Sequence, residues 1–204
     1  MKIYEMRQAP NPRRVRMYLA EKGLSSEVEF VQLDLQKGEN LTPEFKARNP
    51  MKKVPVLELD DGTCIAETQA ICRYFEELHP EQPLMGRTPQ EKALIEQWVR
   101  WLDFYFFIPT GMAFQHGSGY FKDRMKCFPE WGAECRTQAE KFFGFLNSQL
   151  EGKEYLVGDS FSIADINALC TVDFNKVNAL AIAGDQVHLK AWHERISARP
   201  SARA

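Results

Sequence analysis

The sequence has no run of about 18 apolar residues and begins M-K-I-Y-E-M, so it predicts neither a membrane span nor a secretory signal. It also lacks an excess of either charge. Its 26 Lys and Arg residues against 28 Asp and Glu give a net charge of −2, which favours neither nucleic acid nor an anionic membrane as a partner. Its five cysteines form no C-x-x-C pair and no zinc spacing. We therefore expect reduced, mostly buried thiols in a cytoplasmic protein without a metal site.

The first 80 residues alternate strand and helix signals. Strands are predicted over residues 2–6, 28–35, 54–59 and 63–66. Helices are predicted to begin at three residues that would act as N-caps: Asn11, Thr42 and Thr68. Asp61-Gly62 marks the turn between the last two strands. The order β-α-β-α-β-β-α indicates an α+β domain, a small mixed sheet with helices packed on it.

The rest of the chain carries only helical signals. Residues 81–88 (E-Q-P-L-M-G-R-T) are rich in turn formers and predict a linker. Residues 89–204 then predict an all-α bundle, with a long first helix and a second long helix over residues 140–150. A capping box runs from Ser162 to Asp165, and a last helix around Trp192 stops at Pro200.

The stretch from Asn49 to Ile71 predicts a binding site. Pro55 lies at the start of a strand, a position that suits a cis X-Pro bond and leaves the backbone of Val54 free to pair with a ligand. Glu67 and Thr68 then offer a carboxylate, a hydroxyl and a helix N-terminus. This combination suits a small zwitterionic peptide.

Four segments in order resemble the glutathione S-transferase family over essentially the whole chain. They are A-P-N-P-R-R-V-R-M-Y-L-A-E-K-G (9–23), N-P-M-K-K-V-P-V-L (49–57), E-T-Q-A-I (67–71) and D-S-F-S-I-A-D (159–165). The first is most similar to the Gtt2-like bacterial and fungal branch, and the second is also similar to the zeta class of maleylacetoacetate isomerases. The resemblance implies a thioredoxin-like glutathione-binding domain over residues 1–80, an all-helical domain over residues 89–204, a homodimer, and glutathione as cosubstrate.

The resemblance assigns glutathione-binding roles to six residues. Glu67 would pair with the γ-glutamyl ammonium, and Thr68 with the carboxylate of the same group. Val54, enabled by Pro55, would pair with the cysteinyl backbone in antiparallel fashion. Lys53 and Asn40 would reach the glycyl carboxylate, although a solvated surface position is the alternative for Lys53.

Thiol activation departs from the family pattern. The resemblance places Ala9 and Pro10 where the zeta class has a serine, and Asn11 where the beta class has a cysteine. Asn11 is thus the candidate to contact the sulfur, and it is equally suited to be an ordinary N-cap. The Gtt2 branch implies activation by polar groups of the helical domain instead. His116 is the candidate there, with an exposed loop histidine as the alternative.

An aromatic-rich stretch predicts the electrophile site. Tyr105, Met112 and Phe114 are expected to line an apolar pocket between the two domains, although bundle core is the alternative for each. The expected activity is conjugation of the glutathione thiolate to an apolar electrophile in detoxification. A glutathione-dependent isomerase of maleyl-type diacids, or a non-catalytic transferase-like binding module, are the alternatives.

Overall fold

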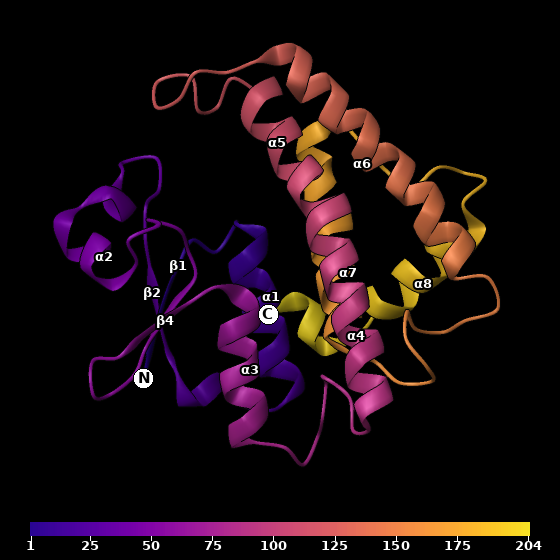
Figure 1. Ribbon diagram of the computed structural model, residues 1–204, viewed down its shortest axis with the longest axis horizontal. Helices are drawn as coiled ribbons and strands as arrows, with labels where there is room; N and C mark the ends of the chain where they lie inside the picture. Colours follow the sequence, from indigo (N-terminus) through magenta and orange to yellow (C-terminus); the bar gives the residue numbers. More distant parts are fainter. The chain divides into compact units, whose positions relative to one another are not determined.

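A computed structural model describes all 204 residues, which form two compact units. The first comprises Met1–Pro83 together with the last five residues, Pro200–Ala204, and the second comprises Leu84–Arg199. Figure 1 shows the elements of both units, coloured along the sequence. None of the helices combines the length and apolarity needed to cross a membrane.

The first unit has the predicted thioredoxin-like order β-α-β-α-β-β-α. Its elements are β1 (Lys2–Glu5), α1 (Pro10–Glu21), β2 (Glu29–Gln32), α2 (Pro43–Arg48), β3 (Val56–Glu58), β4 (Cys64–Ala66) and α3 (Thr68–Leu78), with short 3-10 turns at Ser25–Glu27 and Glu39–Leu41. The strand order is β2-β1-β3-β4, in which β1 and β2 are parallel and the other pairs are antiparallel. Each strand is one to four residues shorter than predicted.

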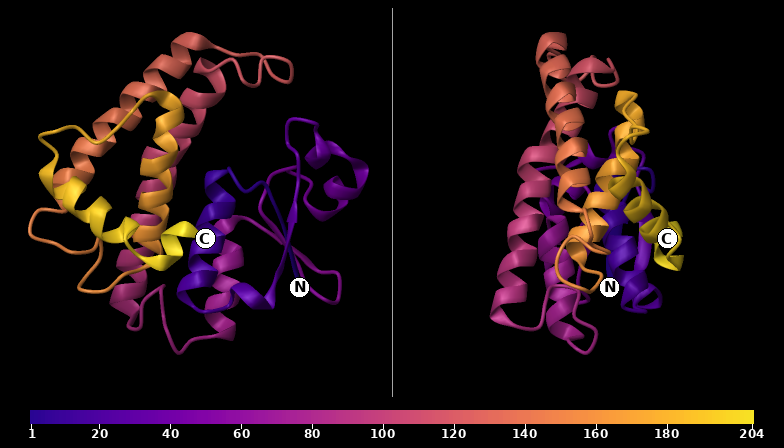
Figure 2. Two further views of the ribbon diagram at one scale, coloured as in Figure 1. Left: turned by 180° about the vertical axis from the view of Figure 1, so that it is seen from behind. Right: turned by 90° about the vertical axis from the view of Figure 1, so that its right-hand side faces the viewer.

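The two faces of the sheet bury alternate residues, as strand geometry requires. Ile3 pairs with Leu57 and both are fully buried. Their neighbours Tyr4 and Val56 pair on the opposite face and pack with Phe45 of α2. Figures 1 and 2 show α1 and α3 together on one face of the sheet and α2 on the other. The helix pair thus covers the larger core, and α2 covers a small one.

The second unit is all-helical, as predicted. Its helices are α4 (Pro89–Trp101), α5 (Ile108–Gly117), α6 (Pro129–Gln149), α7 (Ile163–Phe174) and α8 (Val187–Ser197), with a 3-10 turn at Asn175–Asn178; another, Pro200–Arg203, belongs to the first unit. Within this unit α5 packs against α6, and α7 packs against α4 and α8. The predicted capping box at the start of α7 is present, since Ser162 and Asp165 bond each other's backbone reciprocally.

The helix predicted over residues 140–150 actually begins eleven residues earlier, at Pro129. Its first half buries the small residues Gly132, Cys135 and Ala139, which carry a weak hydrophobic signal. A Cβ at Gly132 would lie 2.8 Å from the backbone nitrogen of Gly117 in α5. The first half of α6 packs closely against α5 through small residues, and glycine is required at position 132. The large apolar residues that reveal a helix by their spacing are therefore missing from this half.

The predicted long first helix contains a π segment, η3, over Leu102–Phe107. Pro109 lies two residues beyond this segment; it has no backbone N–H to donate, and its ring clashes with an ideal α-turn before it. The backbone instead widens, and the N–H of Ile108 bonds to the carbonyl of Asp103, five residues back. The helix axis therefore continues into α5 through the proline.

Candidate functional site

Glu67 and Thr68 stand at the junction of β4 and α3. Glu67 occupies the N-cap position with a φ of 74°, and its side chain makes no capping bond. The prediction that Thr68 caps the helix was wrong, because Thr68 is the first helical residue and is buried. The first N–H groups of α3 thus lack a side-chain cap, while the Glu67 carboxylate is exposed beside them. The junction therefore offers an exposed carboxylate and uncapped N–H donors side by side.

The loop between α2 and β3 is organised by two asparagines. Asn49 is buried, and its Nδ2 donates to the carbonyl of Lys53 at 2.9 Å. Asn40, from the turn before α2, donates to the carbonyl of Lys52 at 2.8 Å. Neither backbone group of Val54 forms a hydrogen bond within the protein. The Val54–Pro55 bond is cis, as predicted.

The start of α1 differs from its prediction. Ala9 is the N-cap, and the helix begins at Pro10, so Asn11 lies inside the first turn. A proline is favoured at the first helical position, which moves the helix start one residue earlier than the asparagine. Pro10 and Pro12 have no N–H group, so Asn11 carries the only free main-chain donor of this turn. The Oδ1 atom of Asn11 is buried without a partner.

Strand register brings these three segments to the same end of the sheet. Val56, at the start of β3, pairs with Ala66, the last residue of β4. It also pairs with Tyr4, near the end of β1. The loop from β1 to α1, the Val54 backbone and the Glu67 turn therefore leave the sheet side by side. The three segments are far apart in the sequence, and the antiparallel pairing of β3 with β1 and β4 brings them together.

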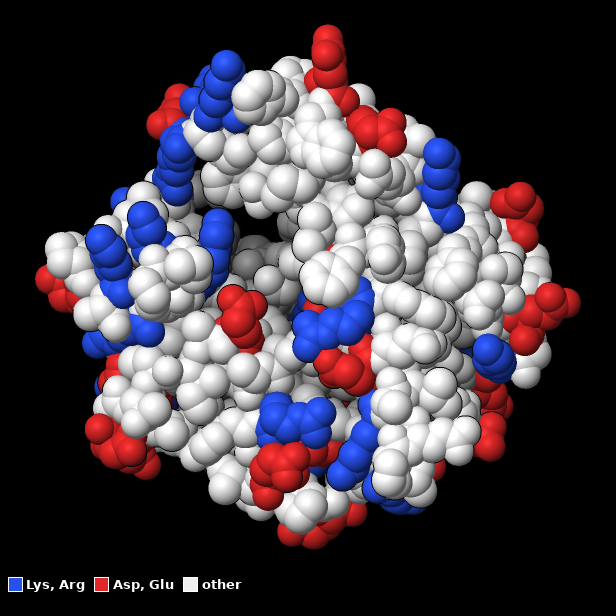
Figure 3. Space-filling model, viewed as in Figure 1, with Lys and Arg blue, Asp and Glu red and all other residues white.

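Basic side chains accompany this end of the first unit. Figure 3 shows Lys and Arg gathered over α2 and its neighbouring loops. The exposed lysines of residues 37–53, which comprise α2 and the loops on either side of it, are Lys37, Lys46, Lys52 and Lys53. Together they provide positive charge next to the loop that carries Val54, which favours an anionic group there.

The remaining candidates belong to the second unit. The alternative of an exposed loop position for His116 is wrong: His116 lies in α5, is buried, and its Nδ1 accepts the Phe128 N–H at 3.1 Å. An accepting Nδ1 leaves any ring proton of the neutral form on Nε2. Tyr105 is 62% exposed on the π segment, and Met112 is half-buried in α5.

Phe114 belongs to an aromatic cluster with three other rings. Its ring centroid lies 5.3 Å from Tyr120, 5.8 Å from Phe121 and 5.7 Å from Phe174. Tyr105 makes no aromatic ring contact of this kind. Of the three predicted pocket residues, Phe114 is thus the one fixed by aromatic packing.

Sequence reasoning missed a buried network that shapes the loop before α1. Glu5 is buried and accepts hydrogen bonds from Arg16 of α1 and from Gln32 of β2. Arg16 also donates to the carbonyl of Arg7 at 2.8 Å, and the Arg7 N–H donates to Gln32 at 3.0 Å. The signal was available, because Arg16 interrupts the apolar run of α1 and a buried charge requires a partner.

The chain is similar to known proteins over its whole length. The chain matches the glutathione S-transferase N-terminal domain over residues 9–78 and the C-terminal domain over residues 130–200. It is 37% identical to glutathione S-transferase 2 of Saccharomyces cerevisiae over 205 residues, which is 100% of this chain and 88% of that protein. The crystal structure of Gtt2 from Saccharomyces cerevisiae superposes with a TM-score of 0.95 at 37% identity, covering 100% of this chain and 99% of that one. A class Gtt2 structure from Vibrio parahaemolyticus gives a TM-score of 0.86 at 32% identity, with 100% and 96% covered.

Proposed function

The chain belongs to the glutathione S-transferase family, and on that premise we propose that it conjugates the glutathione thiolate to an apolar electrophile. The observation that carries the proposal is the Glu67–Thr68 junction, where an exposed carboxylate stands beside the uncapped N-terminus of α3. This arrangement fits a group that carries both an ammonium and a carboxylate.

The γ-glutamyl group would bind at this junction. Its ammonium pairs with the Glu67 carboxylate, and its carboxylate accepts from the Thr68 hydroxyl and the free N–H groups of α3. The positive φ of Glu67 turns the chain sharply between β4 and α3. A non-glycine residue in this region is uncommon, and such residues concentrate at binding sites.

The rest of the peptide would follow the loop before β3. The cysteinyl backbone pairs with the free N–H and carbonyl of Val54, which adds a short strand ahead of Pro55. The glycyl carboxylate then meets the Lys53 ammonium. Asn40 has one amide hydrogen bonded to Lys52, and the other is left for the same carboxylate.

Activation requires the bound thiol to lose its proton, since a free thiol has a pKa of about 8.5. We assign this role to the first turn of α1. The N–H of Asn11, its side-chain amide and the helix dipole act together on a thiolate placed at this turn. The thiolate then attacks the electrophile and forms a carbon–sulfur bond. In a substitution the leaving group departs with its bonding electron pair; in an addition the π bond opens and the resulting carbanion of the adduct takes up a proton. His116 is the alternative donor.

Further properties follow as proposals. Tyr105, Met112 and Phe114 supply apolar contacts to the electrophile, which suits a role in detoxification. The helices α3 and α4 form the interface of a homodimer. All five cysteines are free thiols, which supports a reducing, cytoplasmic location.

The central experiment replaces Glu67 with glutamine, which keeps the shape of the side chain and removes its charge. We expect the dissociation constant of glutathione to rise about tenfold to hundredfold, because a hydrogen bond to a charged group contributes roughly 1.5–3 kcal/mol. Isothermal titration calorimetry measures this dissociation constant. Glu77→Gln is the matched control, since Glu77 is an exposed glutamate on the same helix. Equal affinity of wild type and Glu67→Gln would refute the site.

A further inference from the structure

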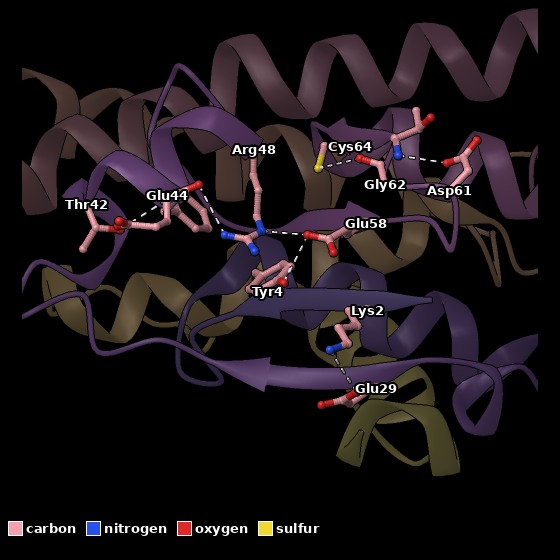
Figure 4. Close-up of polar contacts among 12 residues, drawn as sticks. Lys2, Tyr4, Glu29, Thr42, Glu44, Arg48, Glu58, Asp61, Gly62 and Cys64 are labelled. Carbon is pink, nitrogen blue, oxygen red and sulfur yellow. Dashed lines mark hydrogen bonds and ion pairs between the residues drawn. The ribbon is translucent and has the colours of Figure 1, made fainter.

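Three side chains form a polar cluster on the face of the sheet that α2 covers: Tyr4, Arg48 and Glu58 (Figure 4). The Nε of Arg48 donates to Glu58 Oε2 at 2.6 Å, and the Tyr4 hydroxyl donates to the same oxygen at 3.1 Å. The guanidinium also lies over the Tyr4 ring, 4.6 Å from its centroid. Hydrogen bonding from Arg48 lowers the pKa of Glu58, so the carboxylate stays ionised near neutral pH.

Arg48 links this cluster to the end of α2. It is the last residue of the helix, and its Nη1 donates to the carbonyl of Glu44 at 3.2 Å within the same helix. One guanidinium therefore contacts α2, β1 and β3 at once. Its planar group of five donors makes this possible, and a lysine could not reproduce it.

The helix needs such an attachment because little else holds it. It has only six residues, well below the length at which an isolated helix is stable. Thr42 caps its N-terminus, and Phe45 is its one buried side chain. Phe45 packs on Tyr4 and Val56 in a small apolar cluster that Cys64 adjoins.

The segment beyond Arg48 carries part of the proposed glutathione site. Asn49 follows directly and fixes the carbonyl of Lys53, while Asn40, in the turn before α2, fixes that of Lys52. Any displacement of α2 would thus move Asn40 and Lys53, the two residues assigned to the glycyl carboxylate. Glu67 and Thr68 follow β4 and do not depend on this helix.

We propose that Arg48 and Glu58 form a positioning clamp that makes the protein selective for the glycine-containing tripeptide glutathione over γ-glutamylcysteine. The inference rests on the proposed function. The clamp holds α2 against the sheet and thereby keeps Lys53 and Asn40 in place to bind the terminal carboxylate. The γ-glutamyl half of the ligand binds independently of it.

Calorimetric titration of the full chain with S-methylglutathione and with S-methyl-γ-glutamylcysteine tests the clamp. Arg48→Met should raise the dissociation constant of the tripeptide about fivefold, or roughly 1 kcal/mol, and change that of the dipeptide less than twofold. Arg48→Lys should also lose most of this affinity for the tripeptide, because lysine lacks the planar group of five donors. Turnover at saturating glutathione and the pKa of the bound thiol should not change.

Variants of Glu58 and of a control glutamate show whether the effect is specific to the Arg48–Glu58 pair. Glu58→Gln should reproduce the loss, and the double variant should be no worse than either single one, because both remove the same interaction. Glu77→Gln should have no effect, because Glu77 pairs with Arg73 within α3 at 3.4 Å and neither residue belongs to α2 or to the sheet.

The reactivity of Cys64 provides a second measurement of how firmly α2 is held against the sheet. It uses S-methylglutathione, which has no free thiol that could react with the label. Cys64 is half-buried beside the cluster under α2, and burial raises the pKa of its thiol. In a Cys127→Ser background, which removes the other incompletely buried thiol, Arg48→Met should speed iodoacetamide labelling of Cys64 several-fold. Saturating S-methylglutathione should slow it again. Mass spectrometry of the labelled peptide measures both rates.

The outcomes separate the two proposals. Wild type that binds neither peptide overturns the proposed function and the clamp together. Wild type that binds both peptides equally, or an Arg48→Met variant that loses affinity for both peptides alike, overturns the clamp and leaves the proposed function standing. Unchanged tripeptide affinity and Cys64 labelling in Arg48→Met also overturn it.

Discussion

In the proposed mechanism, a single residue, Asn11, carries most of the contact with the sulfur. The two prolines around it remove the main-chain donors that a helix N-terminus normally offers to an anion. At the start of α1, one N–H and one side-chain amide would therefore bind the thiolate. At the start of α3, several N–H groups are available to bind an anion. This concentration makes the role of Asn11 open to a direct test.

Replacing Asn11 with alanine should raise the pKa of the bound glutathione thiol by about one unit. A hydrogen bond to a charged group contributes roughly 1.5–3 kcal/mol, and one pKa unit corresponds to 1.36 kcal/mol. The ultraviolet absorbance of the thiolate, titrated against pH, gives the value. His116→Ala is the comparison: its main effect should be a loss of roughly 1–3 kcal/mol of stability, because the Phe128 N–H would lose its acceptor. A raised thiol pKa in His116→Ala alone would transfer the role to the imidazole.

At the scale of elements, the start of α7 is fixed by a buried cluster of hydrogen bonds around Asp165. The Asp165 carboxylate accepts four hydrogen bonds, from the Leu156 N–H, the Trp192 indole, and the N–H and hydroxyl of Ser162. It thereby connects the preceding loop, α7 and α8. Burial nonetheless raises the pKa of Asp165 to about 6, because it removes the charged form from water.

Asp165 therefore predicts a specific pH dependence of stability. Its pKa is higher folded than unfolded, so its contribution is fully present below about pH 4 and is lost as the pH rises through 6. Relative to Asp165→Asn, which does not titrate, wild type should gain about 2 kcal/mol between pH 7.5 and pH 4.5. Urea unfolding of both proteins at the two pH values measures the difference. A difference that grows with pH instead would mean that the four donors outweigh burial.

At the scale of the whole molecule, the proposed homodimer predicts a mass of twice 23.5 kDa. Leu78 of α3 and Leu94 of α4 are 50% and 41% exposed, which suits burial against a second copy. Because a two-fold interface repeats each substitution, Leu78→Asp should weaken the dimer about a hundredfold. Analytical ultracentrifugation measures this. Leu41→Asp is the control, since Leu41 is 51% exposed but lies outside α3 and α4; equal dissociation by both variants would contradict the interface.

The sequence by itself determined the class of each half, because strand alternation, turn dipeptides and helical spacing are local signals. It also predicted a binding site at the Val54–Pro55 and Glu67–Thr68 pairs, since a proline at a strand start and a carboxylate at a helix start are local signals as well. It placed the caps of α1 and α3 wrongly. Cap preference ranks residue types, whereas the position of the first helical turn depends on where the preceding strand leaves the sheet.

Only the tertiary structure decided which of these residues lie together. Antiparallel pairing of β3 with both β1 and β4 brings the starts of α1 and α3 to the Val54 backbone, and no spacing along the chain encodes that register. The Arg48–Glu58 ion pair and the close approach of α6 to α5 at Gly132 likewise depend on the tertiary structure. Ion pairs between distant residues and close helix contacts depend on packing, which a single sequence shows only as an isolated charge or a glycine.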